Sequence, residues 1–512
     1  MPRYAAIDVG SNSLRMLAAD VSHGITTVLA QDRQVTRLGE SVFRTGRISD
    51  DAMDFLVATL SRMASVYSRL NILGVRAVAT SAVRDASNQQ EFLQRAGEAL
   101  GTHVEIISGA EEARLIHLGV EARWPRPGER TLSIDVGGGS AELIISQNGE
   151  LIDSVSKPLG AVRLTEIFLK NDPPGPEDLR HMNSFITEKL HSFYEAHAGE
   201  KFDRAIGTSA SAAAVVCAVN QIPRAERDEA DRLGASLNQI QKLNTALGTS
   251  TLAQRRKLTG IGPRRAEIVV GGAAVFARSL EMFGHSGMYY CSAGVRDGVI
   301  ADLAARGVGR EVSRLSPEQR ATAEALAKRY CVDFQHARHI AYLAGCLFDV
   351  LQSVHRLPPS AGKPLEAAGL LHDIGHFVSA TGHHKHSAYL VANSDLPGFT
   401  DGERQVIAAL CRFHRKSLPQ PKHSYFDELN AESKRLVTYL TPLLRMADSL
   451  DRSNEGKVQN VKSVLRDNGI GLEIEANGDV GLELWAAGEA AKVFREIYGF
   501  PISVQRARAQ SV

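Results

Sequence analysis

The chain has 512 residues, of which 44% are hydrophobic, 23% charged and 6% aromatic, a balance typical of a soluble globular protein. At roughly 100 to 200 residues per domain, this length predicts about three or four domains. Lys and Arg number 59 and Asp and Glu number 58, so the net charge is +1. A chain with this charge has no global basic field to recruit nucleic acid, and any anion site must be local.

Cysteine usage and the absence of long apolar runs indicate the compartment. The five cysteines are an odd number and form no CxxC pair, which argues against a disulfide framework and a zinc ribbon. The N-terminus has no apolar signal region, and no apolar run approaches the roughly 18 residues of a membrane span. We therefore expect a cytoplasmic protein without a membrane span.

A duplicated motif organises the first part of the chain. Residues 7–13 read Ile-Asp-Val-Gly-Ser-Asn-Ser and residues 134–140 read Ile-Asp-Val-Gly-Gly-Gly-Ser, an offset of 127 residues (135 minus 8). In each copy an apolar run precedes the Asp, and a second strand-like run follows the turn, over 14–19 or 141–145. Each copy therefore predicts a strand, a tight turn and a second strand.

Helical periodicity appears between these strands and predicts an α/β class. The expected helices cover 52–70, 91–100, 108–119, 179–197 and 230–247. We expect two similar lobes, 1–125 and 126–310, with the Pro- and Gly-containing stretch 124–128 between them.

The pattern changes to amphipathic helices from about residue 316, which predicts an all-α domain over 311–455. Beyond it, the alternating runs 471–475 and 480–484 flank the turn Asn477-Gly478. An Asn-Gly turn between strand-like runs favours a hairpin, so we expect a small α+β domain over 456–512.

The two duplicated turns have the chemistry of phosphate loops. Gly10 and the run 137–139 allow unusual backbone angles, so successive N–H groups can converge on an anion. Further neutral donors are the side chains of Ser11, Asn12, Ser13 and Ser140. The carboxylates of Asp8 and Asp135, which end the preceding strands, can hold Mg²⁺ beside the phosphate. One such turn alone is typical of an ordinary glycine turn, but two matched copies favour phosphate binding.

A predicted helix start supplies a candidate general base. Ser108 and Glu111 have the S-x-x-E spacing of a capping box, which predicts a structural role for Glu111. Glu112 lies about 100° further round the helix and can face a cleft, where it could deprotonate a water molecule. Arg84 and the hydroxylated turn 207–211 are weaker candidates for phosphate contacts.

Together these motifs resemble the exopolyphosphatase/guanosine pentaphosphate phosphohydrolase (Ppx/GppA) family. Besides the turns, the resemblance rests on the segments 108–116, 260–274, 292–299 and 382–389. It implies the two-lobed actin-like ATPase fold shared with sugar kinases.

The resemblance also implies residue roles. Glu112 matches the catalytic glutamate of the family, and Asp135 and Glu142 match its acidic pair associated with Mg²⁺ and water. The positions that match its phosphate contacts are Ser11, Asn12, Arg84, Gly137, Gly138, Gly139 and Ser140. The family often has Ser-Gly-Thr where this chain has Ser209-Ala210-Ser211, which narrows the allowed backbone there. We keep Ser209 as a phosphate-binding candidate.

The 17 histidines are unevenly distributed, because ten of them lie between residues 336 and 423. His336 falls on the apolar face of a predicted helix, and His372 and Asp373 lie near the end of another. Asp448 lies on the inward side of a third helix, where an unpaired buried charge is costly. Imidazoles combined with carboxylates suit Mn²⁺, Fe²⁺, Mg²⁺ or Zn²⁺.

This set of four resembles the metal site of the HD phosphohydrolase superfamily. The resemblance implies a metal-binding HD-like domain, with His386 and His414 as additional ligands of a second metal or of phosphate. The alternative is that the helical domain is a scaffold without metal.

We expect an exopolyphosphatase, with hydrolysis of the 5′-terminal phosphate of guanosine pentaphosphate (pppGpp) by the same residues as the closest alternative. A basic channel would favour the polymer, and its candidates are Arg255, Arg256, Lys257, Arg264, Arg265, Arg415 and Lys416. From a different class, the fold could serve as an ATP-binding actin-like module; a small-molecule kinase ranks last, because no feature names an acceptor hydroxyl. We also expect a homodimer.

Overall fold

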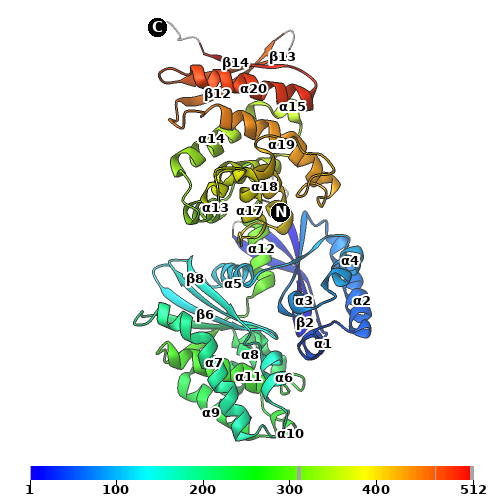
Figure 1. Cartoon of the computed structure of the whole chain (residues 1–512). Coiled ribbons are helices and arrows are strands. Elements are labelled where there is room, and N and C mark those ends of the chain that lie inside the picture. The colour runs from blue at the N-terminus through cyan, green and yellow to red at the C-terminus, as the bar shows by residue number, and fades with distance from the viewer. Residues whose placement is uncertain (1, 23, 308–312, 467–468, 508–512) are drawn as a thin grey trace. The chain divides into compact units, whose positions relative to one another are not determined.

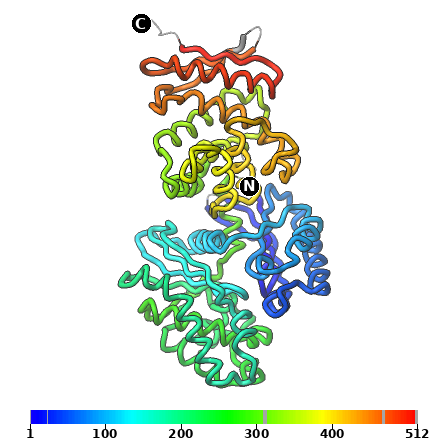
Figure 2. Tube along the Cα trace, in the orientation of Figure 1, coloured from blue at the N-terminus to red at the C-terminus, as the bar shows by residue number. Residues whose placement is uncertain are grey.

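The computed structural model describes residues 2–22, 24–307, 313–466 and 469–507. The chain divides into two compact units, 1–309 and 310–512, whose elements can be followed in Figures 1 and 2. Each unit has its own hydrophobic core. In the described part of the chain, no helix has both the length and the apolar character needed to cross a membrane.

The first lobe of unit 1 contains a five-stranded sheet in the order β3–β2–β1–β4–β5. Its strands are β1 (Arg3–Val9), β2 (Ser13–Ser22), β3 (Ile25–Val35), β4 (Gly74–Ala79) and β5 (Val104–Ile106). The first three strands are antiparallel, whereas β4 and β5 run parallel to β1. The accompanying helices are α1 (Leu38–Thr45), α2 (Asp50–Tyr67), η1 (Ser68–Leu70), α3 (Ser81–Asp85) and α4 (Gln89–Leu100).

The second lobe repeats this order with six strands, β10–β11–β9–β6–β7–β8. They are β6 (Arg130–Val136), β7 (Ala141–Gln147), β8 (Glu150–Lys157), β9 (Arg204–Thr208), β10 (Gly234–Ser236) and β11 (Gly287–Tyr290). Its helices are α6 (Ala161–Phe168), α7 (Pro176–Ala196), α8 (Ser209–Val219), η2 (Arg224–Ala230), α9 (Leu237–Thr249), α10 (Leu252–Arg255) and α11 (Val269–Met282). The repeated topology is that of the two-lobed actin-like ATPase fold, as predicted.

Two helices pack on the opposite lobe from the strand that precedes them in the chain. α5 (Gly109–Arg123) follows β5 of the first lobe but packs on β7 and β8 of the second. α12 (Val295–Ala305) ends the second lobe, yet its Val299, Ile300 and Leu303 are buried against the first sheet (Figure 1). The predicted range 126–310 therefore includes a helix that belongs to the core of the first lobe.

α5 and α12 cross closely because small residues lie at the crossing. A Cβ atom on Gly298 would lie 1.7 Å from the carbonyl oxygen of Leu115, and one on Gly119 would lie 2.5 Å from the carbonyl oxygen of Gly294. Contacts this short admit only glycine without a backbone shift. The crossing thus fixes the start of α5, which carries Glu112, relative to both sheets.

The predicted helix over 230–247 is wrong in its first part. Residues 234–236 form β10, and α9 begins only at Leu237. Ser236 caps α9 in a reciprocal capping box with Gln239, which defines that start.

Unit 2 begins with a helical region. Its helices are α13 (Pro317–Arg329), α14 (Phe334–Val350), α15 (Gln352–His355), η3 (Pro359–Ala361), α16 (Gly362–Leu371), η4 (Ile374–Phe377), α17 (His383–Ala392), α18 (Asp401–Phe413) and α19 (Ala431–Ser449). They are followed by β12 (Val458–Arg466), β13 (Gly469–Ala476), α20 (Gly481–Tyr498) and β14 (Ile502–Arg506). The sheet order is β12–β13–β14.

The predicted hairpin around Asn477-Gly478 is wrong. That turn joins β13 to α20, because residues 481–484 begin a helix whose Phe494 is buried in the core. The antiparallel pair is β12–β13 instead, and its connecting residues 467–468 lie outside the described residues. Strand residues such as Leu472 belong to the same hydrophobic cluster as the helices, so the predicted domain 456–512 has no core of its own.

Candidate active site

The two duplicated turns have the same local geometry. The amide of Gly10 donates a hydrogen bond to the carbonyl oxygen of Ser13 at 3.2 Å. The amide of Gly137 donates to the carbonyl oxygen of Ser140 at 3.0 Å. Both turns therefore present their intervening amides in the same way, as the sequence repeat predicts.

The turns of the two lobes lie against each other. A Cβ atom on Gly138 would lie 3.0 Å from the Cβ of Ser11, and one on Gly139 would lie 2.4 Å from the hydroxyl oxygen of Ser81. The close approach of the lobes therefore disfavours a side chain at these positions, independently of any anion that the amides bind.

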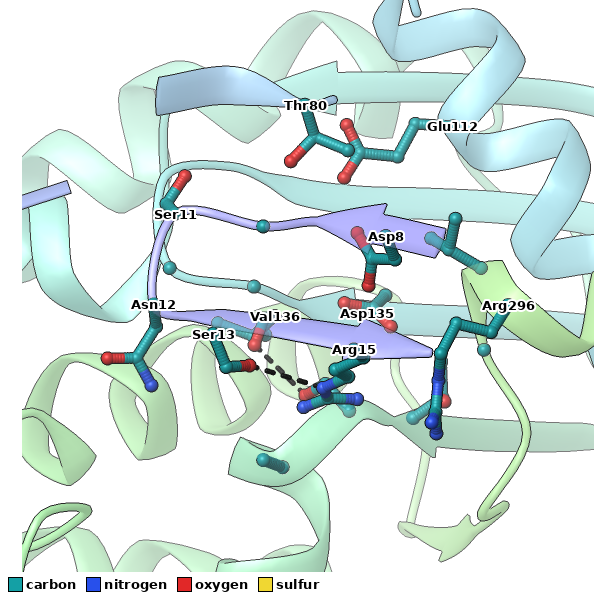
Figure 3. Close-up of a pocket in the computed structure, with 18 of the residues that line it drawn as sticks. Asp8, Ser11, Asn12, Ser13, Arg15, Thr80, Glu112, Asp135, Val136 and Arg296 are labelled. Carbon is teal, nitrogen blue, oxygen red and sulfur yellow. Dashed lines mark hydrogen bonds between the residues drawn. The ribbon is translucent and has the colours of Figure 1, made fainter. Parts of the chain in front are cut away.

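A cavity of about 90 Å³ lies between the lobes (Figure 3). The predicted residues that line it are Asp8, Ser11, Asn12, Ser13, Glu112, Asp135, Gly137, Gly138, Gly139, Ser140 and Ser209.

The second lobe contributes a pair of buried carboxylates. Asp135 on β6 and Glu142 on β7 are direct register partners. Burial, followed by the charge of Glu142, raises the pKa of Asp135 to about 8. Burial also raises the pKa of Glu142 to about 7, although the Ser156 hydroxyl donates to its Oε1 at 2.7 Å. The Glu142 Oε2 atom is buried and has no hydrogen-bond partner among the described residues. Such a pair requires protons or a cation.

The first lobe places an arginine where the second has Glu142. Asp8 on β1 is the register partner of Arg15 on β2, and Arg15 lies 127 residues before Glu142 (142 minus 15). Burial raises the pKa of Asp8, while Arg15 opposes that shift. Figure 3 shows the Asp8 and Asp135 carboxylates facing one another, with Arg15 beside them.

The start of α5 separates the roles of two adjacent glutamates. The Ser108 hydroxyl oxygen accepts a hydrogen bond from the amide of Glu111 at 3.2 Å, so the predicted N-cap is present. The carboxylate of Glu111, predicted to serve the cap, instead forms ion pairs with Arg76 at 3.0 Å and Arg114 at 2.8 Å. This buried network anchors the first turn of α5.

Glu112 faces the cavity beside Thr80 (Figure 3). Burial, followed by the charge of Glu142, raises the pKa of Glu112 well above its usual range. Its Oε2 atom is buried without a hydrogen-bond partner in the described part of the chain, and the Arg84 Nη1 lies 3.9 Å from it. A carboxylate with a free oxygen and a raised pKa is suited to accept a proton from water.

Arg84, a predicted phosphate contact, lies beside Glu112, with its Nη1 3.9 Å from the Glu112 Oε2. It does not line the cavity; its Nη1 donates to the carbonyl oxygen of Ile107 at 2.6 Å, behind Glu112. Its role as a phosphate contact stays a prediction. Glu142 also lies outside the cavity wall, beside its register partner Asp135.

Three predicted hydroxyl groups are already engaged in the turns. The Ser11 hydroxyl oxygen accepts a hydrogen bond from the amide of Ala82 at 3.2 Å, and that of Ser13 accepts one from the Arg15 Nε–H at 3.2 Å. These two oxygens act as acceptors, so their O–H groups can still donate to an anion. Ser209 donates to the carbonyl oxygen of Val136 at 2.9 Å, which leaves it less free for phosphate.

Ser209 also adopts φ = 83°, a region that is unusual for a residue other than glycine. Backbone strain of this kind costs about 1 to 3 kcal/mol and clusters at functional sites. The strained residue is thus Ser209 and not Ala210, which stands where the family often has glycine.

Four arginines line the cavity, namely Arg15, Arg227, Arg265 and Arg296. Only Arg265 is anticipated, as a channel candidate. Arg15 could have been found by aligning the two copies beyond the turn, because the aligned residue in the second copy is Glu142. Arg227 follows no motif and reaches the cavity only through the tertiary fold.

A second cavity of about 450 Å³ adjoins the first and shares residues such as Asn12 and Arg227 with it. Its arginines are Arg33, Arg224, Arg227, Arg264 and Arg265. Among the described residues that line it there is neither an acidic nor an aromatic side chain. Of the other predicted channel residues, Arg255 pairs with Asp172 at 3.3 Å and Arg256 with Glu267 at 3.0 Å.

Unit 2 brings the predicted metal ligands together. Ligand atoms of His336, His372 and Asp373 all lie within 4.8 Å of one another. The Asp448 Oδ1 lies 3.7 Å from the His372 Nε2. The two further candidates, His386 and His414, are in neither of the metal-sized groups found among the described residues. The His414 Nε2 nevertheless lies 3.7 Å from the Asp373 Oδ1.

Two histidines that the sequence analysis does not single out join this cluster. The Nε2 atoms of His376 and His383 lie 3.7 Å and 3.3 Å from the Asp373 Oδ1. They follow the His-Asp pair on η4 and α17, and the spacing from Asp373 to His376 is that of one helical turn.

Comparisons with known proteins agree with this architecture. A family model described as the Ppx/GppA phosphatase family matches residues 17–306, and a model of domain III of that family matches residues 319–481. The crystal structure of the Aquifex aeolicus member of the Ppx/GppA family has a TM-score of 0.53 and 26% identity, covering 59% of this chain and 97% of its own. An exopolyphosphatase from Cytophaga hutchinsonii has a TM-score of 0.54 and 26% identity, with coverage of 59% and 97%.

An exopolyphosphatase-like protein of known structure is similar to the same extent, with a TM-score of 0.56, 29% identity and coverage of 59% and 97%. The first family model alone spans more than half of the chain. The chain therefore belongs to the Ppx/GppA phosphatase family.

Proposed function

We propose that this protein is an exopolyphosphatase that releases the terminal phosphate of inorganic polyphosphate in the cavity between the lobes of unit 1. The observation that carries the proposal is Glu112. This buried carboxylate has an unpartnered oxygen and faces both phosphate turns. A carboxylate in that position can accept a proton from water.

The turns bind the terminal phosphoryl group. Their backbone amides and the O–H groups of Ser11 and Ser13 donate to its oxygens, and Arg15 and Arg296 offset its charge. Glu112 accepts a proton from a water molecule as the water oxygen bonds to phosphorus. The bridging P–O bond then breaks, and the shortened chain leaves with the electron pair of that bond.

Mg²⁺ fits the carboxylates of this site. Asp8, Asp135 and Glu142 would hold it, since all three are oxygen ligands with raised pKa values and one buried Glu142 oxygen has no partner among the described residues. In the described residues no three cleft carboxylates converge within 4.8 Å, which suits an ion that keeps several of its waters. When bound, Mg²⁺ would offset negative charge on the phosphoryl oxygens.

Hydrolysis of pppGpp by the same residues is the closest alternative. The adjoining arginine cavity favours polyphosphate, because phosphate units further along the chain would meet five guanidinium groups there. A guanine base would find no aromatic side chain to stack on and no carboxylate for its N–H donors among the residues described in that wall. An ATP-binding module without hydrolysis would have no use for the buried carboxylate of Glu112.

The test is phosphate release from long polyphosphate and from pppGpp by wild type and Glu112→Gln. We expect a higher kcat/KM for polyphosphate and a fall in kcat of about 10²- to 10⁴-fold in the variant. Glu121→Gln, on the same helix but away from the cavity, is the matched control and should retain activity. Near-normal release by Glu112→Gln would refute the mechanism, and a preference for pppGpp would establish the alternative.

A further inference from the structure

A second repeat in the sequence ends two equivalent strands of unit 1. Thr-Ser-Ala at 80–82 recurs at 208–210, an offset of 128 residues (208 minus 80). The first copy directly follows β4, which runs parallel to β1, and the second begins at the last residue of β9, which runs parallel to β6. Thr80 and Thr208 both line the cavity between the lobes. Each lobe thus brings one threonine of the repeat to the active site.

Neither threonine caps the helix that follows it. Thr80 and Thr208 are the N-cap residues of α3 and α8, where a threonine oxygen commonly accepts a hydrogen bond from the first helical turn. Both turns lie within the described residues, and neither contains this hydrogen bond. In α3 the amide of Ala82 donates to the Ser11 hydroxyl oxygen at 3.2 Å instead. Both threonine hydroxyl groups are therefore available for other partners.

The two hydroxyl groups differ in what they bind. That of Thr208 donates to the carbonyl oxygen of Ala293, so its proton is used within the protein. The Thr80 hydroxyl has no hydrogen-bond partner among the described residues, although only 4% of the residue is exposed. A buried hydroxyl without a partner is costly, so this one must take its partner from the contents of the cavity.

The backbone fixes the position of this hydroxyl. The Thr80 amide donates to the carbonyl oxygen of Val9 at 3.2 Å, and the amide of Arg84 donates to the Thr80 carbonyl oxygen at 3.0 Å. The β-branched side chain restricts rotation about χ1. A partner in the cavity would therefore meet a pre-positioned hydroxyl, and little entropy is lost when the two bind.

Glu112 supplies the complementary group. Figure 3 shows its carboxylate directed toward Thr80, and both residues line the cavity. Its Oε2 atom is buried and has no hydrogen-bond partner in the described part of the chain. A water molecule has two O–H groups, and an unpartnered carboxylate oxygen and an unpartnered hydroxyl oxygen can accept one each. The pair therefore fits one water molecule held in a defined orientation.

We propose that Thr80 is a further catalytic residue, whose hydroxyl oxygen holds the water molecule that Glu112 deprotonates; this role rests on the hydrolytic function proposed above. One O–H of the water donates to Thr80, and the proton of the other passes to Glu112 as the water oxygen bonds to phosphorus. The bridging P–O bond breaks, and the shortened chain leaves with its electron pair. Thr80 keeps its own proton and fixes the direction of attack.

Phosphate release from long polyphosphate by the full chain with Mg²⁺ tests this role. Thr80→Val keeps the branched shape without the hydroxyl, so we expect kcat to fall about 10- to 100-fold. KM should stay within about twofold, because the substrate itself loses no contact. Thr80→Ser keeps the hydroxyl and should retain most of kcat. A raised KM with normal kcat would make Thr80 a phosphate-binding residue and overturn the proposal.

Methanol as a competing nucleophile gives a readout that does not depend on the amount of folded enzyme. Each turnover then yields phosphate or methyl phosphate, according to whether water or methanol attacks. Methanol has a single O–H, which Glu112 accepts, so it does not need Thr80. Thr80→Val should therefore raise the ratio of methyl phosphate to phosphate about 2- to 10-fold, the effect of one hydrogen bond. An unchanged ratio beside a lower kcat would show that the loss is structural and would overturn the proposal.

Thr59→Val is the matched control. Thr59 is also buried, but its hydroxyl donates to the carbonyl oxygen of Phe55 at 2.8 Å on α2, and it does not line the cavity. The variant should keep the wild-type kcat and product ratio. Wild-type values in Thr80→Val would overturn the role of Thr80 alone, whereas a wild type that releases no phosphate would refute the proposed function with it.

Discussion

In the first lobe Asp8 pairs in register with Arg15, whereas in the second lobe Asp135 pairs with Glu142 at the equivalent strand positions. The turn between the strands closes with the same hydrogen bond in both lobes. The backbone of the duplicated motif is thus retained while one charge is reversed. The first copy is balanced and can face an anion, but the second carries two buried carboxylates whose pKa values rise to about 8 and 7. A cleft between unlike copies can hold a phosphate and a cation side by side.

Arg15→Glu removes this difference and should have the largest effect. It would place another carboxylate beside Asp8 and repel the phosphoryl group, and like charges brought together cost several kcal/mol. We expect kcat/KM for polyphosphate to fall about 10²- to 10³-fold, measured as phosphate release. Arg69→Glu, on the exposed surface of the same lobe, makes the same charge change and should have little effect. Equal losses in both variants would mean that net charge, not the register position, is responsible.

Asp135→Asn tests how much the buried carboxylate pair destabilises the folded protein. The folded protein holds the pKa of Asp135 at about 8 against an ordinary 3.8, so between these values the folded state keeps a proton that the unfolded chain has released. Stability is therefore lost as pH rises from about 4 through 8. Without metal, the variant should be more stable than wild type at about pH 8, by the order of a few kcal/mol, with a smaller difference at about pH 5.

Urea unfolding at both pH values, with and without Mg²⁺, measures this effect. Mg²⁺ should stabilise wild type more than the variant, because the cation offsets the charge that the variant lacks. A variant that is less stable than wild type at the higher pH would show that the carboxylate is compensated within the protein itself.

The sequence predicts the parts of the site that depend on local structure. The phosphate turns are short and repeated, and Glu112 follows a capping signal within a few residues. Both can therefore be identified from the sequence. By contrast, the position of Arg227 in the cavity and that of Arg84 beside Glu112 depend on elements that come together only in the folded protein. Glu111 is a further example. Its carboxylate pairs with Arg76 and Arg114, which are brought to it by the fold, and not with the local helix cap.

The fold shows a similar division. The duplicated strand–turn–strand pattern predicts the antiparallel pairs β1–β2 and β6–β7. The packing of α5 and α12 on the opposite lobes has no local signal beyond the glycines at their crossing. The Asn477-Gly478 turn is correctly a turn but not a hairpin, since the following residues bury an apolar helix face instead of forming a strand. Around Asp373, the His-Asp pair is visible in the sequence, but the choice of His383 over His386 depends on which face of α17 is buried.

The pH dependence of the reaction gives the smallest effect but distinguishes the two copies most directly. Glu142 raises the pKa of Glu112 and Arg84 lowers it. Because Glu112 must be ionised to accept a proton, kcat/KM should rise with pH through that pKa. Glu142→Gln should move this acid limb to lower pH and Arg84→Gln to higher pH, each by the order of one unit. Arg15→Gln should lower the rate and move the limb less than either of these variants, since Glu142 and Arg84 are the largest charge effects on Glu112. If Glu142→Gln and Arg84→Gln shift the profile in the same direction, the limb belongs to another group, and the second copy does not control the protonation of Glu112.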